Sequence, residues 1–494
     1  MLNPVVVTVW WLGFFSAIGL CVGSFLNVVI FRLPRNRSLR APLWSACPYC
    51  EHQIRWYDNL PIASFILLSG KCRDCRAPIP TRYLVVEASM ALVVLMLLDA
   101  FVIGNVRSGM SLSRFGLSDC LAYDWPMLVA HIVLFACLFS MSAIDLEHYW
   151  VDVRFTNLAT GVGLVLHTLW TPGHSMDWCR PFDTTAVMAL LALAGLAITW
   201  IVLICQPRVD PEDMPEPMEE QFQASPQSTD EPPFPPLKKP ARGPGWVAVV
   251  LLAGLFLWLM VAASQTEPRG HSVRALIPLA FFFYLIVREG SVARQSDQEI
   301  VEAIEEERFG ARKMVLAELV LLLPALFLGV VGFYLMRVDG NLPEQISDAL
   351  HWHVRIGNVS MLRHWSPMYG FATAASGYVI AGALGWAVRI VFTLIFGREA
   401  FGAGDIHLMA AAGCVAGWPV VVLAFFLTCG LAVLGWLISS PFKRSRAVPL
   451  GPWLSLSCLI VAVFYDAILR FPIVARAVDA SRMLFLRNSQ LFGG

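Results

Sequence analysis

Long apolar runs, broken by polar segments, fill most of this sequence. Runs long enough to cross a bilayer, at about 20 residues each, fall at 5–31, 83–103, 127–146, 155–171, 184–205, 246–264, 274–288, 314–336, 369–396, 406–418, 419–440 and 450–470. The runs at 155–171, 274–288 and 406–418 are shorter than the rest, which suits tilted or re-entrant helices. The pattern predicts an all-α polytopic membrane protein with about twelve spans.

Composition supports a lipid environment. Of the 494 residues, 57% are hydrophobic and only 15% are charged, which lies outside the range of soluble globular proteins. A formal net charge of zero indicates no nucleic-acid partner. Residues 206–245 are rich in Pro, Glu, Asp, Gln and Ser and cannot bury enough apolar surface to fold, so they are predicted to form a linker.

The basic residues that flank the runs predict the orientation in the membrane. The segment after the first run is rich in arginine from Arg32 to Arg82, so it should be cytoplasmic and the N-terminus should lie outside. Alternation from there places further basic segments inside: 206–245, 289–313, 397–405 and 441–449.

The first cytoplasmic segment carries two C-x-x-C pairs, separated by 21 residues: Cys47-Pro48-Tyr49-Cys50 and Cys72-Arg73-Asp74-Cys75. This spacing is close to that of zinc ribbons. Four thiolates complete a closed tetrahedral site with no position for a substrate water, so we predict structural zinc. A redox-active thiol pair and an iron–sulfur site are the alternatives. The other eight cysteines lie mostly in apolar runs and are expected to be buried small hydrophobes.

Two aspartates at the ends of apolar runs are the candidate catalytic residues. Asp405 follows Gly402 and Gly404, which allow a tight turn and the close approach of a neighbour. A carboxylate beside lipid is costly, so we expect a functional partner, and Asp145 is the best candidate. The predicted orientation puts both at the cytoplasmic ends of their helices. Such a pair shares one proton and can activate a water and protonate a leaving amine.

Plainer roles compete with this interpretation. Asp405 on its own also fits a helix cap. The two carboxylates together also suit a proton or cation site in a non-enzymatic transporter or assembly factor.

Other charged residues interrupt the apolar runs: Glu87, Asp99, Glu318, Arg389 and Asp466. We expect Asp99 and Asp466 to be interfacial and Glu318 to pair with Lys313. Glu87 should lie close to the cysteine segment.

Taken together, the motifs resemble the type IV prepilin peptidases, the leader peptidases and N-methyltransferases of type IV pilus and type II secretion systems. The matching stretches are 23–34 (GSFLNVVIFRLP), the two C-x-x-C pairs with 54–61 (IRWYDNLP) between them, 82–87, Ile144-Asp145 and Gly402-Ala403-Gly404-Asp405. They cover roughly 1–170 and 369–470.

The resemblance implies a membrane aspartic endopeptidase of the bacterial inner membrane, with Asp145 and Asp405 as its catalytic pair and the active site facing the cytoplasm. It implies cleavage of prepilin or pseudopilin leader peptides, followed by methylation of the new N-terminus with S-adenosylmethionine. The residues that would bind this cofactor are not indicated.

On this resemblance, about eight helices form the core and about four are inserted. The expected parts are a first transmembrane helix (1–32), the four-cysteine zinc loop (33–82), membrane core with the first aspartate (83–171), the insertion with its Pro-rich linker (172–368), membrane core with the second aspartate (369–470) and a C-terminal tail (471–494).

Three departures from the family pattern stand out. Asp152 and Val153 occupy positions where the family usually has Pro-Asp, and His407 stands where it often has Lys. The region 172–368 makes the chain longer than typical members. These departures are also compatible with an alternative, in which the chain is a family member that keeps only one of the two activities.

Overall fold

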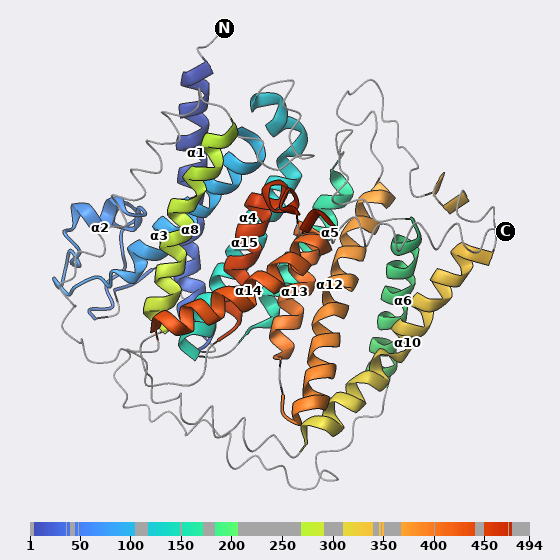
Figure 1. Ribbon diagram of the computed structural model, residues 1–494. Coiled ribbons are helices and arrows are strands. Elements are labelled where there is room, and N and C mark those ends of the chain that lie inside the picture. Colours follow the sequence, from blue (N-terminus) through green and yellow to red (C-terminus); the bar gives the residue numbers. More distant parts are fainter. Residues whose placement is uncertain are drawn as a thin grey trace.

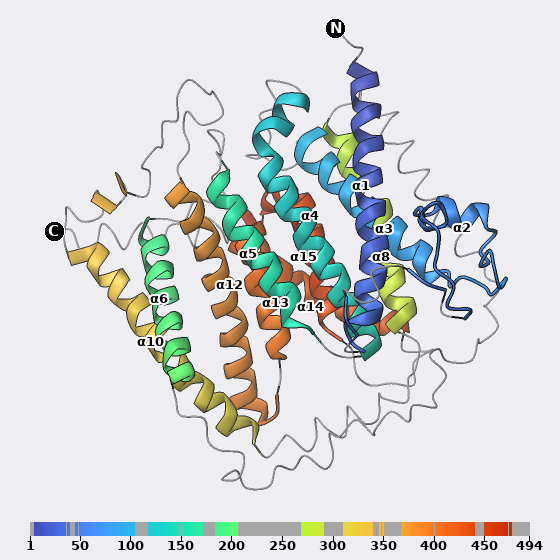
Figure 2. The same ribbon diagram turned by 180° about the vertical axis from the view of Figure 1, so that it is seen from behind.

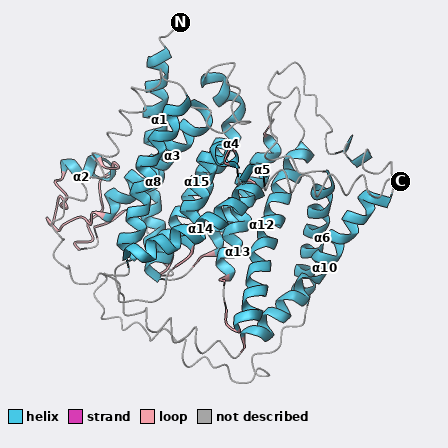
Figure 3. Cartoon of the chain, in the orientation of Figure 1, coloured by secondary structure: helices cyan, strands magenta, loops and turns pink. Residues whose placement is uncertain are grey.

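The computed structural model describes residues 4–35, 37–39, 45–47, 49–103, 117–148, 151–170, 183–205, 268–290, 310–338, 345–346, 348–349, 367–399, 401–439, 449–472 and 474–476. These residues form helices joined by loops, and no named strand occurs among them (Figure 3). The predicted all-α fold is therefore confirmed. The linker predicted at 206–245 and the apolar run predicted at 246–264 lie outside the described residues.

The helices follow the predicted apolar runs closely. They are α1 (Pro4–Arg32), η1 (Trp56–Asn59), α2 (Ala63–Leu67), α3 (Arg82–Leu98) with its π-helical continuation η2 (Asp99–Ile103), α4 (Leu117–His148), α5 (Val153–Leu169), α6 (Asp183–Cys205), α8 (Pro268–Gly290), α10 (Ala311–Val338), α12 (Pro367–Phe396), α13 (Ala403–Ala416), α14 (Trp418–Ser439) and α15 (Gly451–Leu469). Eight are long and apolar enough to cross a membrane, and α8 and α13 hold shorter apolar stretches.

The helices α4, α5, α13, α14 and α15 form the centre of the molecule (Figures 1 and 2). On one side lie α1 and α3, with the cysteine segment and α2 at the edge. On the other side α12 separates the centre from an outer pair, α6 and α10. The helix α8 comes from the predicted insertion, yet it packs against α3, α14 and α15 beside the centre.

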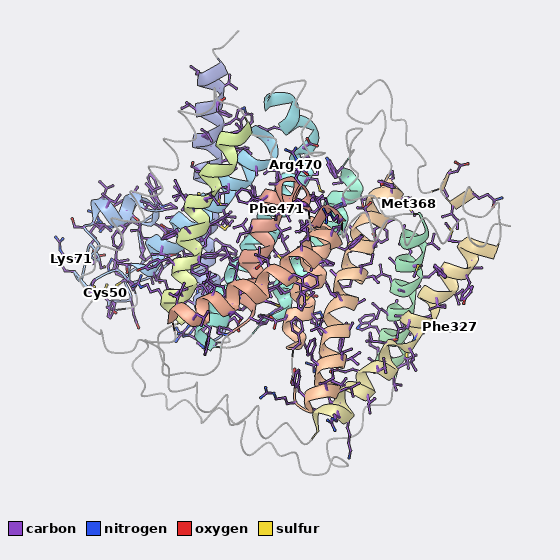
Figure 4. The ribbon with its side chains drawn as sticks, viewed as in Figure 1. Cys50, Lys71, Phe327, Met368, Arg470 and Phe471 are labelled. Atoms are coloured by element: carbon purple, nitrogen blue, oxygen red, sulfur yellow. The ribbon has the colours of Figure 1, made fainter. Side chains whose placement is uncertain are left out.

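Burial distinguishes the inner helices from the outer ones. In α3, 94% of the most apolar window is buried, whereas in α6 and α10 the share is 17%. Phe327 on α10 is 67% exposed at the outer edge (Figure 4). Apolar side chains that face outward are those of a helix bathed in lipid, so these surfaces fit a membrane protein.

Small residues allow α13 to pack closely against α12. A Cβ added at Gly377 would overlap the carbonyl of Gly413, and one added at Gly413 would lie 2.5 Å from the Cβ of Ala381. Helices in membranes pack closely through small residues because lipid supplies no hydrophobic force between them. This contact fixes the position of α13, which carries Asp405.

The expectation that the scattered cysteines are buried was wrong for three of them. Cys21, Cys205 and Cys429 are exposed on helix faces, although Cys137, Cys414 and Cys458 are buried as expected. A small apolar thiol suits lipid as well as a protein core, so an apolar run alone does not distinguish the two. Asp99 is 3% exposed in η2, at the end of α3, and its position at the membrane interface stays a prediction.

Candidate active site and metal centre

The two candidate aspartates come together at the junction of three helices. Asp145 lies in the last turn of α4 and is 7% exposed, and Asp405 lies in the first turn of α13 and is partly buried. They are close enough for their charges to interact. The sequence predicts Asp145 as the best partner of Asp405 and places both at cytoplasmic helix ends, and the structure brings the two carboxylates into one site.

Gly451, the first residue of α15, is the meeting point of the pair. Its backbone N–H donates a hydrogen bond to the carboxylate of Asp145. A Cβ on Gly451 would lie 2.7 Å from Oδ2 of Asp145 and 3.7 Å from Oδ1 of Asp405. Both carboxylates therefore reach the same small space, which exists because residue 451 has no side chain. The sequence alone does not point to Gly451, because its only signal is a glycine at the start of the last apolar run.

The glycines before Asp405 are needed for space. Gly402 caps α13 with φ −67° and ψ 141°, which any residue adopts, and its carbonyl accepts the N–H of Asp405 at 3.2 Å. A Cβ on Gly402 would lie 3.3 Å from Oδ2 of Asp405, and one on Gly404 would lie 2.6 Å from the Cβ of Val151. The expected close approach is present, between the start of α13 and the α4–α5 connection.

A cavity of about 260 Å³ lies beside this junction, between α3, α4, α8 and α15. Ser142, Ala143 and Leu146 line it from the α4 turns around Asp145, and Pro452 and Ser455 line it from the start of α15. Most of the remaining lining is apolar.

An ion pair between two lining residues forms part of the polar end of the cavity. Arg82 at the start of α3 donates to Glu147 at the end of α4, two residues beyond Asp145. Because Arg82 is the last residue of the four-cysteine loop (33–82), this contact also places the end of that loop near the paired aspartates.

Asp152 does not add a free charge to the site. It caps α5, and its carboxylate accepts the backbone N–H of Arg154 at 2.9 Å and the guanidinium of Arg154 at 2.7 Å. An aspartate at this position satisfies the open helix end, as N-cap carboxylates do. The pKa of Arg154 is raised by the same hydrogen bond. The departure from the family pattern here is locally compensated.

The four cysteines of the predicted zinc loop form one cluster. The Sγ atoms of Cys47, Cys50, Cys72 and Cys75 all lie within 4.8 Å of one another, and those of Cys47 and Cys75 are 3.8 Å apart. Ligand atoms at 2.3 Å from a tetrahedral zinc are roughly 3.8 Å from each other. The cluster could therefore bind a metal ion in a closed site. It lies at the edge of the molecule marked by Cys50 in Figure 4.

Both C-x-x-C turns have the same backbone construction. The N–H of Cys47 donates to the carbonyl of His52 and the N–H of Cys72 to that of Ala77, at 3.0 and 2.8 Å. In each turn the residue after the second cysteine has a positive φ, 56° at Glu51 and 61° at Arg76. Two equivalent turns facing each other are what a four-thiolate site requires.

The thiols of the cluster sit in different environments. Burial raises the pKa of Cys47 to about 12. The pKa of Cys72 is lowered to about 7, first by the N–H of Cys75 and then by that of Asp74. Metal binding deprotonates such thiols, because the thiolate is the ligand.

Two carboxylates hold the cysteine segment in place: Asp58 joins two of its parts, and Glu87 joins it to α3. Asp58 accepts two hydrogen bonds from Arg73, at 2.7 and 2.6 Å, which tie η1 to the second C-x-x-C turn. The guanidinium of Arg73 lowers the pKa of Asp58. Glu87 of α3 is 7% exposed and accepts the N–H of Ile62 at 2.8 Å. Glu87 lies close to the segment as expected, and it anchors that segment.

Glu318 does not pair with Lys313. Arg389 of α12 donates to Glu318 of α10 through Nε and Nη2, at 3.0 Å each. A sequence rule that looks for neighbours on the same helix cannot find a partner on another helix. His407 is partly buried on α13, and Asp466 is partly buried near the end of α15.

Fold and site define a multi-pass helical membrane protein with paired carboxylates at a helix junction and a four-cysteine cluster at the same end. The family model described as the bacterial peptidase A24 N-terminal domain matches residues 17–101. Residues 17–101 are therefore similar to this N-terminal domain.

Several curated relatives are similar over parts of the chain. The prepilin leader peptidase/N-methyltransferase of Myxococcus xanthus (strain DK1622) is 36% identical over 153 residues, which cover 31% of this chain and 39% of the relative. The protein of the same name from Burkholderia pseudomallei (strain 1026b) is 30% identical over 216 residues, covering 39% and 60%. That of Vibrio cholerae is 44% identical over 86 residues, covering 16% and 34%.

The chain spans between 34% and 60% of the length of the curated relatives compared. No solved structure matches it significantly.

Proposed function

We propose that this chain is a membrane aspartic endopeptidase that removes the leader peptides of type IV prepilins or pseudopilins. The observation that carries the proposal is the convergence of Asp145 and Asp405 on Gly451. The relatives named prepilin leader peptidase support the substrate class.

The paired carboxylates supply both halves of the proton chemistry. Two carboxyl groups so close share one proton, because both cannot ionise easily. The ionised carboxylate takes a proton from a water, which attacks the scissile carbonyl. The protonated carboxyl gives its proton to the leaving amine, as in aspartic proteases. The N–H of Gly451 holds Asp145 in place during these steps.

The cavity beside the pair suits the entry of a hydrophobic segment. Its volume of about 260 Å³ is below the range of about 300–1,000 Å³ for small-molecule pockets, and its walls between α3, α4, α8 and α15 are largely apolar. It has room for a few apolar side chains of a substrate helix. Arg82, Glu147 and Arg288 line its polar part, where a leader peptide would remain in water.

The proposed location is the bacterial inner membrane, with the site facing the cytoplasm. The positive-inside rule supports this, because the arginine-rich segment from Arg32 to Arg82 lies at the same end as the aspartates.

In this proposal zinc is held by Cys47, Cys50, Cys72 and Cys75 and stabilises the loop, since four thiolates leave no open position for chemistry. Methylation of the new N-terminus, with S-adenosylmethionine as the donor, is proposed from the names of the relatives alone.

The test is to incubate the purified protein with a prepilin peptide, with and without S-adenosylmethionine. The masses of the products are then measured by mass spectrometry. Cleavage at the end of the leader supports the peptidase, and a further methyl group that needs the cofactor supports the methyltransferase. Cleavage without methylation would indicate a peptidase only. An uncut peptide, together with ion flux into vesicles, would instead favour a transporter.

A further inference from the structure

A buried guanidinium lies behind the loop that carries Asp405. Arg389 is 2% exposed in α12, in the middle of apolar sequence. Its Nε and Nη2 form a fork on the carboxylate of Glu318 at 3.0 Å each. Its Nη1 donates to the carboxylate of Glu399 and to the backbone carbonyl of Phe401, the latter at 2.5 Å. A buried charge is tolerated at such a place when it is fully paired.

This network holds the segment between α12 and α13 at two points. Glu399 and Phe401 are the last described residues before Gly402, which begins the turn into Asp405. The side chain of Phe401 is 5% exposed and packs edge to face on Phe425, with ring centroids 6.2 Å apart. The carbonyl held by Arg389 therefore lies four residues before the candidate catalytic carboxylate.

One half of the network comes from the outer pair of helices. Glu318 belongs to α10, which lies beyond α12 and packs on α6 (Figure 1). Arg312, on the same helix, has its guanidinium 3.3 Å from the position of a Cβ on Gly397. The start of α10 thus reaches the α12–α13 segment directly through Arg312 and indirectly through Glu318 and Arg389, although most of its apolar surface faces outward.

We propose that Glu318, acting through Arg389, is a positioning residue for Asp405. The inserted helix pair α6 and α10 then supports the active site instead of serving as a spacer. This inference rests on the proposed function, in which Asp405 is catalytic. Its physical basis is that a planar guanidinium with five donors fixes two carboxylates and a carbonyl in one geometry. Without Glu318 the fork loses its acceptor, so the guanidinium is free to shift and the carbonyl of Phe401 is held less firmly.

The test compares Glu318→Gln with Glu318→Asp and with Arg389→Lys. Glutamine keeps the shape of Glu318 but removes its charge, aspartate keeps the charge, and lysine keeps the charge of Arg389 but cannot form the fork. Lys313→Gln is the matched control, because Lys313 is an exposed charge on the same helix. Each variant is purified in detergent and its folded fraction is measured before kinetics with a prepilin peptide.

We expect Glu318→Gln and Arg389→Lys to lower kcat by roughly 10- to 100-fold, the effect of misplacing a reacting group by up to about 1 Å. KM should change little, because neither residue lines the cavity. Glu318→Asp should recover part of the loss, and Lys313→Gln should behave as wild type. A loss of kcat that merely follows the folded fraction, or wild-type kcat in Glu318→Gln, overturns the proposal.

Hydrogen exchange gives a readout that does not depend on cleavage. Amides in 397–405 should exchange faster in Glu318→Gln than in wild type, while those of α4 near Asp145 should not change. Unchanged exchange in 397–405 overturns the proposal even if activity falls. A protein that cleaves no prepilin peptide, or that still cleaves one after Asp405→Asn, instead overturns the proposed function, and exchange still decides whether Glu318 holds the segment.

Discussion

The space at Gly451 offers a direct test of the paired-carboxylate site. In Gly451→Ala, the new methyl carbon would lie 2.7 Å from Oδ2 of Asp145 and 3.7 Å from Oδ1 of Asp405. Carbon and oxygen in close contact are commonly about 3.3 Å apart or more. The carboxylate of Asp145 must therefore move by about 0.6 Å, or the start of α15 must move away from it.

This displacement should cost more in catalysis than in folding. Misplacing a reacting group by about 1 Å can cost about 100-fold in rate, so we expect kcat to fall by roughly 10- to 100-fold, or about 1.4 to 2.7 kcal/mol in activation free energy. Overpacking by one methyl group in a tight core typically costs about 1–3 kcal/mol of stability. The protein should therefore remain folded while cleavage becomes slow.

The assay is cleavage of a prepilin peptide at saturating concentration, with thermal unfolding measured on the same samples. Gly430→Ala is the matched control, since nothing lies within 4 Å of a Cβ at that position on α14. Wild-type kcat in Gly451→Ala would show that the two carboxylates do not work at this junction. Equal losses in both variants would point to a general effect of replacing helix glycines.

Three further predictions concern the pair, the metal loop and the α5 cap. Asp145→Asn and Asp405→Asn should each lower kcat by at least about 100-fold, which is the lower end of the contribution of general acid–base catalysis. The circular dichroism signal of the helices should not change. Normal cleavage by either variant would reject the pairing. Cys47→Ser should reduce the zinc content measured by mass spectrometry of the metal, while Cys429→Ser on the exposed face of α14 should keep it. Asp152→Ala should lower the free energy of unfolding by about 1 kcal/mol and Asp152→Asn by much less, because asparagine is an equally good N-cap, and both should keep kcat near wild type.

The sequence predicted the helices well because apolar length is the dominant signal in a membrane protein. It also predicted the partner of Asp405, because a carboxylate at the edge of an apolar run needs a partner and the orientation places Asp145 on the same side of the membrane. It did not predict Gly451, because the N–H that holds Asp145 comes from a distant helix and leaves no pattern. The partner of Glu318 was wrong for the same reason: Lys313 is near in sequence, whereas Arg389 is near only in the fold.

The sequence also could not separate lipid-facing from core-facing apolar positions. Lipid and a protein core select the same side chains, so Phe327 and Phe282 have similar sequence surroundings. In the structure Phe327 on α10 is 67% exposed and Phe282 on α8 is 6% exposed. Only helix packing tells them apart.

This difference divides the predicted insertion into two parts with different physical roles. Phe282 and Ile286 of α8 line the cavity beside the aspartates, and Phe283 packs on Trp453 with ring centroids 5.5 Å apart. Trp453 lies two residues beyond Gly451, so α8 supports the start of α15 on the Asp145 side of the pair. The outer helix α10 reaches the Asp405 side through Glu318 and Arg389. The described helices of the region 172–368 therefore reach the junction in two ways: α8 packs directly beside it, and α10 is linked to it through Arg389 of α12.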